Sequence, residues 1–446
     1  MKIKHSILSL LLVLFILNNT IAQSEQKIFM TKSENIISLF KNRNYDSLSL
    51  QFNEQQISFN SAAALASNYE PLIEKYGGFT KFRYAGFSEN IGQINLEYIS
   101  KTVYNIDFLI ELVFNRENKK LILYRFTETY KSYAIPEYAN AESYNDESIT
   151  FAADTTMPLT GILSLPISNK KVPLVIIIPA AGPSDADGNF VSKPYKDIAT
   201  GLASEGFAVF RYNKRSLNYG YNLSQNKMNG VLFTPREDVL DDLQAAINLL
   251  RKNPKVDSTK IYLLGHGEGA YLAPFVATEN PFIKGIIMMG ANANHPLEMM
   301  IDQNKYLGRI LPHKKVHFDE DDAKAKIVLK HKVKENTSYF LLPHEIPAKY
   351  WLWINKYDQI KVAKKLTIPI FIMQGARDYQ VDKKNFAVWE KKLKKHKNVT
   401  FKIYEKMNHI MHSGEGESTY SEYAIMRHIP FEVINDLHVW LQKNTN

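Results

Sequence analysis

The stretch that decides the fold runs from residue 260 to residue 270 and reads KIYLLGHGEGA. Its first half is a short apolar run with the composition of a buried strand. Gly265, Gly267 and Gly269 then permit a tight turn, and a helix-like segment follows. The sequence therefore predicts a strand, a sharp turn and a helix, with Gly267 at the tip of the turn.

Strand-like and helix-like segments alternate around this stretch. Buried strands are expected at residues 172–178, 207–212, 260–265, 283–289 and 368–373, and helices at 194–205 and 236–253. This alternation predicts right-handed crossovers and a doubly wound, mostly parallel sheet. Residues 148–153 and 159–165 are expected to form an antiparallel hairpin at its edge, and residues 292–366 a helical lid over the strand ends.

The first third of the chain has another pattern. Two runs with helical spacing precede strand-like runs, at residues 33–52, 62–76, 94–99, 103–113 and 121–126. They predict a small α+β domain at residues 23–135. It carries no cluster of metal-ligating or acid–base residues in sequence, so its role stays open. Residues 136–147 lack a periodic apolar face and are expected to be a linker, with a second domain at 148–446.

The N-terminus has the features of an export signal. Lys2 and Lys4 precede an apolar stretch at residues 7–17, and small residues follow up to Ala22. We interpret residues 1–22 as a signal peptide, because so short an apolar stretch cannot span a membrane core that needs about 20 residues. The mature protein is expected to be periplasmic or secreted, without stable membrane insertion.

Composition excludes several functional classes. The chain has 446 residues, of which 45% are hydrophobic and 23% charged, so it is neither disordered nor fibrous. Its net charge of +9 is spread along the chain, and the one dense basic run, residues 391–397, is expected to be a solvated helix face. No nucleic-acid-binding module accompanies it. Because there are no cysteines, disulfides and thiolate metal sites are excluded, and we expect neither a cofactor nor a metal.

Polar residues follow several of the predicted strands. In an open parallel sheet, ligands bind beyond the carboxyl ends of the strands. Three such stretches accompany the turn at Gly267, namely AAGPSDADGN at 180–189, QGARDYQV at 374–381 and MNH at 407–409. They place a carboxylate, Asp378, and an imidazole, His409, at the same edge of the sheet. His409 could then take a proton while Asp378 fixes its tautomer.

These stretches, with RYNKRS at residues 211–216, resemble the α/β-hydrolase superfamily, in particular its bacterial esterase-like branch. That branch writes them as GHSEGG, GSGPxDRDGN, RYDKRG and QGERDYQV. The resemblance covers residues 148–446 and implies an α/β-hydrolase fold, preceded by a small α+β domain, and carboxylic-ester hydrolysis. It further implies Asp378 as the acid and His409 as the base of a catalytic triad, with the backbone N–H groups of Ala181 and Glu268 as the oxyanion hole.

The chain departs from this pattern at three positions. Gly267 stands where the family has its nucleophilic serine, Ala186 replaces an arginine, and Asn213 replaces an aspartate. Glycine tolerates the backbone of the turn but supplies no attacking oxygen. We therefore expect an esterase-like protein whose serine chemistry is disabled or strongly impaired. His266, beside the tip, is expected to be a packed residue.

Two other functions stay open for a small acyl or ester ligand. Water activated by His409 and Asp378 could hydrolyse an ester directly, or the site could bind an acyl or carboxylate ligand without turnover. Glu268 is a weak substitute nucleophile because its side chain leaves the turn in another direction. Ser184 and Ser413 are expected to be ordinary loop hydroxyls.

Further residues have two interpretations each. His412 could be the base instead of His409, although His409 fits the family better. Trp351, Trp353 and Tyr357 could line an acyl pocket or form the core of the lid. The sequence makes no prediction of oligomeric state.

Overall fold

The computed structural model describes residues 25–90, 92–104, 106–129, 133–189, 191–220, 233–311 and 314–445. The predicted signal peptide, residues 1–22, lies outside them. The chain forms two compact units, one made of Met1–Tyr133 with Tyr420–Met426 and the other of Ala134–Thr419 with Arg427–Asn446. In the described ranges, no helix combines the length and apolarity needed to cross a membrane.

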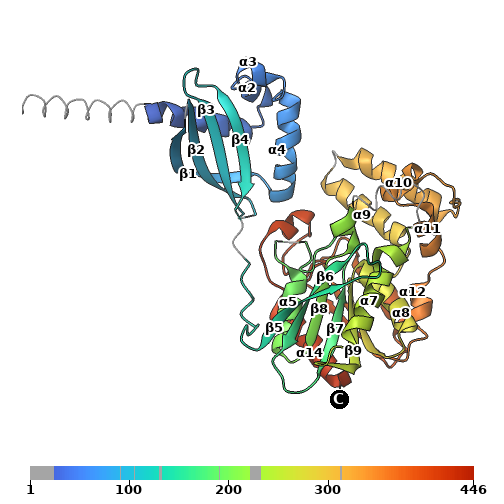
Figure 1. The fold of residues 1–446 in the computed structure, drawn as a ribbon. Helices are drawn as coiled ribbons and strands as arrows, with labels where there is room; N and C mark the ends of the chain where they lie inside the picture. Colours follow the sequence, from blue (N-terminus) through green and yellow to red (C-terminus); the bar gives the residue numbers. More distant parts are fainter. Residues whose placement is uncertain are drawn as a thin grey trace, which may run out of the picture. The chain divides into compact units, whose positions relative to one another are not determined.

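The larger unit is built on an eight-stranded sheet (Figure 1). Its strands are β5 (Tyr144–Phe151), β6 (Leu159–Pro166), β7 (Val172–Ile178), β8 (Ala208–Tyr212), β9 (Val256–His266), β10 (Ile283–Met289), β11 (Ile370–Gly375) and β12 (Val399–Tyr404). They lie in the order β12-β11-β10-β9-β7-β8-β6-β5. The strands from β8 to β12 are parallel, and β5 and β6 add an antiparallel edge. The predicted mixed, mostly parallel sheet is confirmed.

Helices cover both faces of this sheet. Helices α7 (Asp241–Leu250), α8 (Glu268–Glu279) and α13 (Lys383–Leu393) pack into one core, and α5 (Pro194–Ser204) and α14 (Phe431–Thr445) into the other. Along β7, Leu174 and Ile176 belong to the first core and Val175 and Ile177 to the second. Because both faces are buried, the strand is apolar throughout, which is why its bounds could be predicted.

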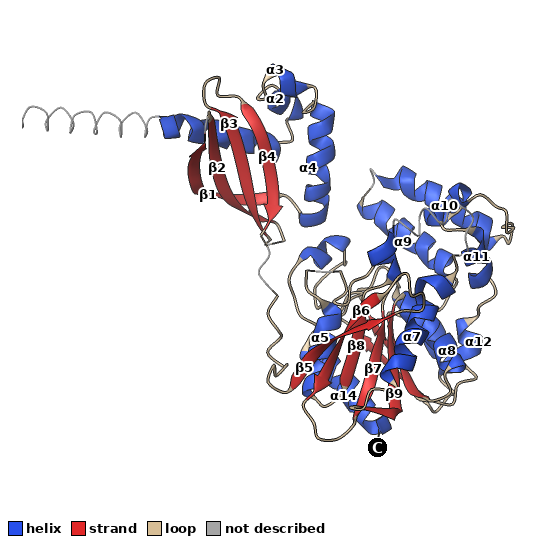
Figure 2. Cartoon of the chain, viewed as in Figure 1, coloured by secondary structure: helices blue, strands red, loops and turns tan. Residues whose placement is uncertain are grey.

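Residues 292–366, predicted as the lid, hold a series of helices (Figure 2). These are α9 (Pro296–Ile310), α10 (Lys315–Leu329), the short 3₁₀ turns η3 (Tyr339–Leu341) and η4 (Pro343–Glu345), α11 (Ala348–Ile354) and α12 (Gln359–Ala363). Buried side chains of these helices, such as Leu297 and Trp351, join the first core of the sheet. The lid is therefore continuous with the packing that supports α8.

The smaller unit is an antiparallel sheet with helices packed on one face. Its elements are a helix over residues 25–41, α2 (Tyr45–Ser49), α3 (Glu54–Ile57), α4 (Ala62–Tyr76), β1 (Phe79–Asn90), β2 (Gln93–Thr102), β3 (Asp107–Asn115) and β4 (Leu121–Glu128). Strand β1 was not predicted. Its pairing with β2 shifts register between Phe79 and Lys81 and between Tyr84 and Gly86, and such irregularities interrupt the period of two on which strand prediction depends.

Two boundaries differ from the prediction. The short helix η5 (Tyr420–Ala424) belongs to the smaller unit, where Ala424 is 3% exposed in the core, although residues 148–446 were predicted as one domain. The chain returns to the larger unit at Arg427, and the carboxylate of Asp197 accepts the backbone N–H of Ile429 at 2.8 Å. Strand β5 begins at Tyr144, inside the predicted linker 136–147, because an edge strand with exposed polar positions shows no apolar run.

Candidate active site

The turn between β9 and α8 has an unusual backbone. Gly267 has φ 54° and ψ −112°, a conformation that L-residues adopt only under strain. Its N–H donates to the carbonyl of Met289 and its carbonyl accepts the N–H of Tyr271, both at 3.0 Å. The sharp turn predicted from the sequence is thus held by neighbouring backbone on both sides.

The flanking glycines allow the helix to approach the sheet. A Cβ on Gly265 would lie 2.3 Å from the carbonyl oxygen of Gly269, and one on Gly269 would lie 2.1 Å from that of Ile178. Both distances are far inside van der Waals contact. Any side chain at either position would force α8 away from the strand end.

Asp378 and His409 form a buried pair. Asp378 Oδ2 lies 2.7 Å from His409 Nδ1, and each residue is 4% exposed. The other carboxylate oxygen accepts the backbone N–H groups of Gln380 and Val381, at 2.8 and 2.9 Å. Gln374 Nε2 donates to Oδ2 at 3.0 Å. The carboxylate is therefore fixed from several sides and holds the imidazole in the tautomer that protonates Nδ1.

The free nitrogen of His409 faces the turn. A Cβ built on Gly267 would lie 3.4 Å from His409 Nε2 and 3.3 Å from the Cβ of Ala180. Among the residues that the structure describes, none forms a hydrogen bond with this nitrogen. The structure thus brings together the three predicted positions 267, 378 and 409, with the basic nitrogen directed at the side-chain position of residue 267.

A buried chain of hydrogen bonds connects the two loops around this pair. The Ala180 N–H donates to the Tyr195 hydroxyl at 3.0 Å, so that hydroxyl donates its own proton to His266 Nδ1 at 2.9 Å. His266 Nε2–H then donates to the carbonyl of His409 at 3.0 Å, and the two imidazole rings lie 4.4 Å apart. Burial lowers the pKa of His266 well below its ordinary 6.5, which keeps the ring neutral as this chain requires. The sequence predicted only packing here.

Two residues with unbonded backbone N–H groups line the same cavity. Ala181 and Glu268 both line a cavity beside His409 and Gly267. Within the described part of the chain, neither N–H has a hydrogen-bond acceptor. The N–H of Glu268 also lies at the start of the 12-residue helix α8, where the helix dipole favours negative charge. This arrangement can bind an oxyanion or a carboxylate.

The side chain of Glu268 belongs to a charged network. Its carboxylate accepts the Tyr350 hydroxyl at 2.6 Å and lies 3.4 Å from Lys214 Nζ, which is also 3.4 Å from Asp238. Burial disfavours the ammonium of Lys214, but the two carboxylates outweigh it and raise its pKa above the ordinary 10.5. Lys214 therefore remains charged and fixes Glu268. Lys214 lies in the stretch RYNKRS, residues 211–216, that the sequence analysis had singled out. Nothing in the sequence pointed to Tyr350.

The cavity has a volume of about 320 Å³. Most of its wall beyond the polar end is apolar, with contributions from Leu297, Met300, Ile346, Trp351, Ile354 and Val381. Of the three lid aromatics considered for a pocket, only Trp351 lines it. Trp353 and Tyr357 pack against Phe275 instead, with ring centroids 5.3 and 5.7 Å away. They belong to the core of the lid.

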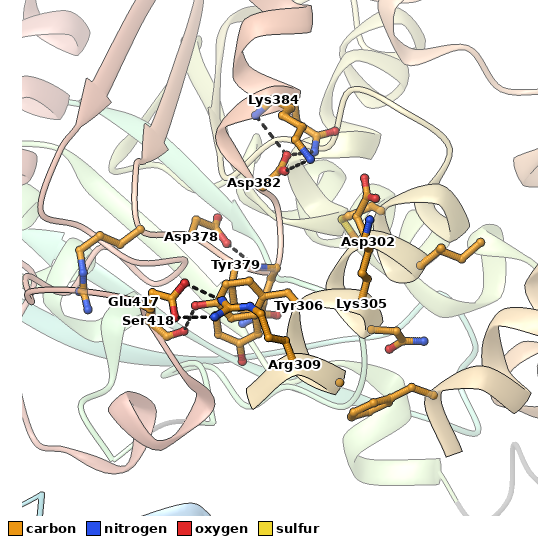
Figure 3. Close-up of a pocket in the computed structure, with 18 of the residues that line it drawn as sticks. Asp302, Lys305, Tyr306, Arg309, Asp378, Tyr379, Asp382, Lys384, Glu417 and Ser418 are labelled. Atoms are coloured by element: carbon orange, nitrogen blue, oxygen red, sulfur yellow. Dashed lines mark hydrogen bonds and ion pairs between the residues drawn. The ribbon is translucent and has the colours of Figure 1, made fainter. Parts of the chain in front are cut away.

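A second, larger cavity of about 830 Å³ adjoins the first, since Met299 and Gln380 line both. Figure 3 shows its charged wall, where Arg309 pairs with Glu417. Asp378 borders this second cavity while His409 borders the first. The acid–base pair therefore lies between the two.

The remaining candidates lie outside the site. Ser184 is buried and donates to the carbonyl of Asp185, and Ser413 is exposed; neither lines the cavity. His412 is buried, and neither ring nitrogen has a partner among the described residues. Burial lowers its pKa to about 3, with help from Arg427 and His428. Asp378 is hydrogen-bonded to His409 and not to His412, so His409 is the histidine that fits the role of base.

The other two departures from the family pattern lie side by side. The Ala186 N–H donates to Asn213 Oδ1 at 2.8 Å. An arginine and an aspartate at these positions would be neighbours of opposite charge, so replacing both by neutral residues leaves no unpaired charge. Asp185 Oδ1 also accepts three successive backbone N–H groups in this loop, which is turn chemistry.

Two sequence comparisons identify relatives of this chain. Esterase EstD of Thermotoga maritima is 33% identical over 334 residues, which cover 74% of this chain and 75% of that protein. The sequence profile of the family described as serine aminopeptidase S33 matches residues 189–417. This range includes positions 267, 378 and 409.

Solved structures with related folds include three hydrolases. Est1E from Butyrivibrio proteoclasticus is 16% identical, with a TM-score of 0.45, over 67% of this chain and 98% of that chain. The Pyrococcus furiosus esterase Pf2001 is 14% identical, with a TM-score of 0.45, over 71% of this chain and 100% of its own. The Pyrococcus horikoshii acylaminoacyl peptidase is 15% identical, with a TM-score of 0.46, over 82% of this chain, which spans 51% of that chain.

The family profile covers about half of the chain, and the identity to the esterase extends over three quarters of it. The fold predicted from the sequence, an α/β-hydrolase unit preceded by a small α+β unit, is confirmed. The chain belongs to the serine aminopeptidase S33 family of α/β-hydrolases.

Proposed function

We propose that this chain is an exported, esterase-like α/β-hydrolase that has lost acyl-enzyme chemistry because residue 267 is glycine. The esterase-like part follows from the family and from the 33% identity to an esterase. The loss of the nucleophile and the export are our own inferences. Export rests on the leader-like residues 1–22, and it predicts a mature protein that begins at Gln23.

One observation carries the loss of the nucleophile. A Cβ at position 267 would lie 3.4 Å from His409 Nε2, so a hydroxyl one bond beyond it could come within hydrogen-bond distance of that nitrogen. Glycine offers no oxygen there. Removing the nucleophile from a serine triad lowers kcat by about 10⁶, while the remaining site can retain about 10³–10⁴ over the uncatalysed reaction.

Direct hydrolysis by water is the second candidate, and the open nitrogen of His409 favours it. A water molecule in the space that a serine would fill could donate to Nε2 and attack an ester carbonyl held by the N–H groups of Ala181 and Glu268. The water proton would pass to His409 and then to the leaving alcohol. This route forms no covalent intermediate.

The test measures hydrolysis of short p-nitrophenyl esters by the wild type, Gly267→Ser and His409→Ala. The main proposal expects a silent wild type and a burst of p-nitrophenol from Gly267→Ser, since a serine would complete the triad. A wild type that turns over without a burst and loses activity in His409→Ala would instead establish the water route. A folded Gly267→Ser protein that neither releases a burst nor turns over would contradict both, because it would mean that the site is not esterase-like.

A further inference from the structure

We propose that a patch of exposed lysines, at the end of the large sheet opposite the candidate active site, binds the protein peripherally to an anionic lipid surface. The patch consists of residues 361–368 and 391–398, and we call it the basic edge. The first segment contains three lysines, the second contains five, and neither contains an aspartate or a glutamate. This inference goes beyond the proposed function and does not depend on the chemistry at residue 267.

The dense basic run at residues 391–397 is only partly helical. It was predicted as a solvated helix face, but α13 ends at Leu393, and Lys395 and Lys397 follow the helix. All five lysines of the run are exposed. The run therefore forms the end of a helix and the loop that leads into β12.

The two segments of the basic edge lie side by side. The first leads into β11 and the second into β12, and these neighbouring strands are parallel. The side-chain nitrogen of Asn398 donates to the carbonyls of Leu366 and Ile368, at 3.1 and 2.7 Å. The lysines of both segments therefore gather at the amino ends of the same two strands.

The lysines of the basic edge have no ionic partners within the described part of the chain, and all eight are exposed. The last turns of α12 and α13 favour nearby cations, as at Lys361 and Lys391. This local effect does not balance eight like charges, which repel one another unless an anionic partner neutralises them. The basic edge is thus a surface that an anionic partner would stabilise.

Another lysine-rich segment gives a useful contrast. Residues 319–335, on and after α10 of the lid, contain five lysines and five carboxylates, so their charges cancel. The basic edge, with eight lysines and no carboxylate, has a charge of +8. The absence of carboxylates, and not the number of lysines alone, distinguishes it.

The partner that fits this patch is an extended surface and not a small anion. No lysine of the basic edge lines either of the two cavities described above. The ammonium group of lysine is a point charge that does not require one fixed geometry of its anion. Exposed lysines outside a cavity can therefore meet many phosphate groups in many orientations.

The composition of the patch favours a lipid surface over a nucleic acid. Single-stranded nucleic acids stack their bases on aromatic rings, and bidentate contacts with guanine or phosphate favour arginine. Neither segment of the basic edge contains Phe, Tyr, Trp or Arg. Clusters of roughly four to eight basic residues attract anionic lipid headgroups without such features.

Binding through the basic edge would leave the candidate active site open to solution. The lysines precede β11 and β12, whereas Asp378 and His409 follow the same strands. Each strand has six residues, which span about 20 Å at about 3.3 Å per residue. The basic edge and the acid–base pair therefore lie at opposite ends of the sheet.

The experiment measures cosedimentation with lipid vesicles, using the chain from Gln23 onward because the apolar stretch at residues 7–17 would itself enter lipid. We expect binding at low ionic strength to vesicles of phosphatidylglycerol and phosphatidylcholine in equal amounts, and none to phosphatidylcholine alone. About 0.5 M NaCl should release the protein, because salt screens the attraction. Equal binding to both kinds of vesicle, or binding that resists this salt, would overturn the proposal.

Four substitutions test the basic edge directly. The combined variant Lys364→Gln, Lys365→Gln, Lys394→Gln and Lys395→Gln should lower the vesicle partition coefficient at least about 100-fold, since each lysine contributes about fivefold. Arginine at the same four positions keeps the charge and should retain binding within about threefold. Loss of binding in the arginine variant, with an intact fold by circular dichroism, would mean that charge is not what binds.

A matched control removes the same charge from the lid. The combined variant Lys326→Gln, Lys330→Gln, Lys332→Gln and Lys334→Gln changes four exposed lysines of the segment 319–335. It should bind vesicles within about threefold of the wild type, because these lysines lie among carboxylates. An equal loss in the two glutamine variants would mean that the net charge of the protein, and not the basic edge, governs binding.

A competition experiment distinguishes the two kinds of polyanion. A short DNA duplex, added to vesicle-bound protein at an equal concentration of phosphate, should leave most of the protein on the vesicles. If the duplex removes the protein from the vesicles and the basic-edge variant fails to bind it, the partner is a nucleic acid and the proposal is wrong. These measurements use the native Gly267, so their outcome is independent of whether Gly267→Ser hydrolyses esters.

Discussion

The two halves of the site differ in how completely they are built. On one side, His409 is held by Asp378, by the ring of His266 and by a hydrogen bond to its backbone carbonyl. On the other side, the tip of the turn carries a glycine. In our proposal His409 is a general base held in place by these contacts, and among the described residues the turn offers no side-chain oxygen for it to act on.

The difference has a physical reason. Position 267 holds a backbone conformation that strains an L-residue by about 1–3 kcal/mol, so glycine relieves strain there. The groups around His409 are buried and bonded to one another, and deleting one of them leaves its partner without a hydrogen bond in the core. A nucleophile can therefore be lost without cost to the fold, whereas the acid–base pair is part of what holds the core together.

The largest expected effect removes the acid of the pair. In the Gly267→Ser protein, Asp378→Asn should lower kcat for a p-nitrophenyl ester by about 10⁴, or about 5.5 kcal/mol, because the amide stabilises the wrong tautomer of His409. Steady-state kinetics with a short-chain ester measures this. The exposed Asp302→Asn, on the lid, is the control and should change kcat less than twofold. A drop of less than tenfold would mean that Asp378 does not orient the base.

The next effect removes a support on the side of the turn. Lys214→Met leaves the carboxylates of Asp238 and Glu268 buried without their cation, and the free energy of unfolding should fall by about 3–5 kcal/mol. Urea unfolding followed by tryptophan fluorescence measures it. Lys305→Met, on an exposed position of α9, should change stability by less than about 0.5 kcal/mol. If the two variants have the same free energy of unfolding, Lys214 does not hold Glu268 in place.

A buried histidine outside both halves gives the smallest effect. The unfolded chain protonates His412 near pH 6.5 while the folded protein resists until about pH 3, so the wild type loses stability as the pH falls through this window. His412→Leu should be about 2–3 kcal/mol more stable than the wild type at pH 4.5 and should differ little at pH 7.5. Denaturant unfolding at both pH values tests this. A stability difference that does not depend on pH would mean that the ring is protonated in the folded state.

The sequence predicted those strands that are buried on both faces, because a buried strand appears in the sequence as an uninterrupted apolar run. Strands β7 and β10 have the bounds 172–178 and 283–289 that their apolar runs predicted. Strand β1 escaped prediction because irregular pairing interrupts its alternation. The position of η5 in the smaller unit also escaped, since it depends on contacts between residues more than 300 positions apart.

The same division applies to the site. Residues 267, 378 and 409 follow strand ends within recognisable motifs, and the parallel sheet brings strand ends together. The supporting residues Tyr195 and Tyr350 act through side-chain contacts between helices and loops, which no local pattern encodes. The sequence therefore identified the candidate positions 267, 378 and 409, whereas the residues that orient them could be found only in the structure.

The most direct test of the account uses a fluorophosphonate probe and the intact mass of the protein. Our account predicts no adduct on the wild type, because no hydroxyl of the described residues forms a hydrogen bond with His409 Nε2. It predicts one adduct on Gly267→Ser, located by peptide mapping at residue 267 and lost when His409→Ala is added. An adduct on the wild type, or an adduct on Gly267→Ser at another residue, would contradict the claim that Gly267 occupies the nucleophile position of an otherwise complete site.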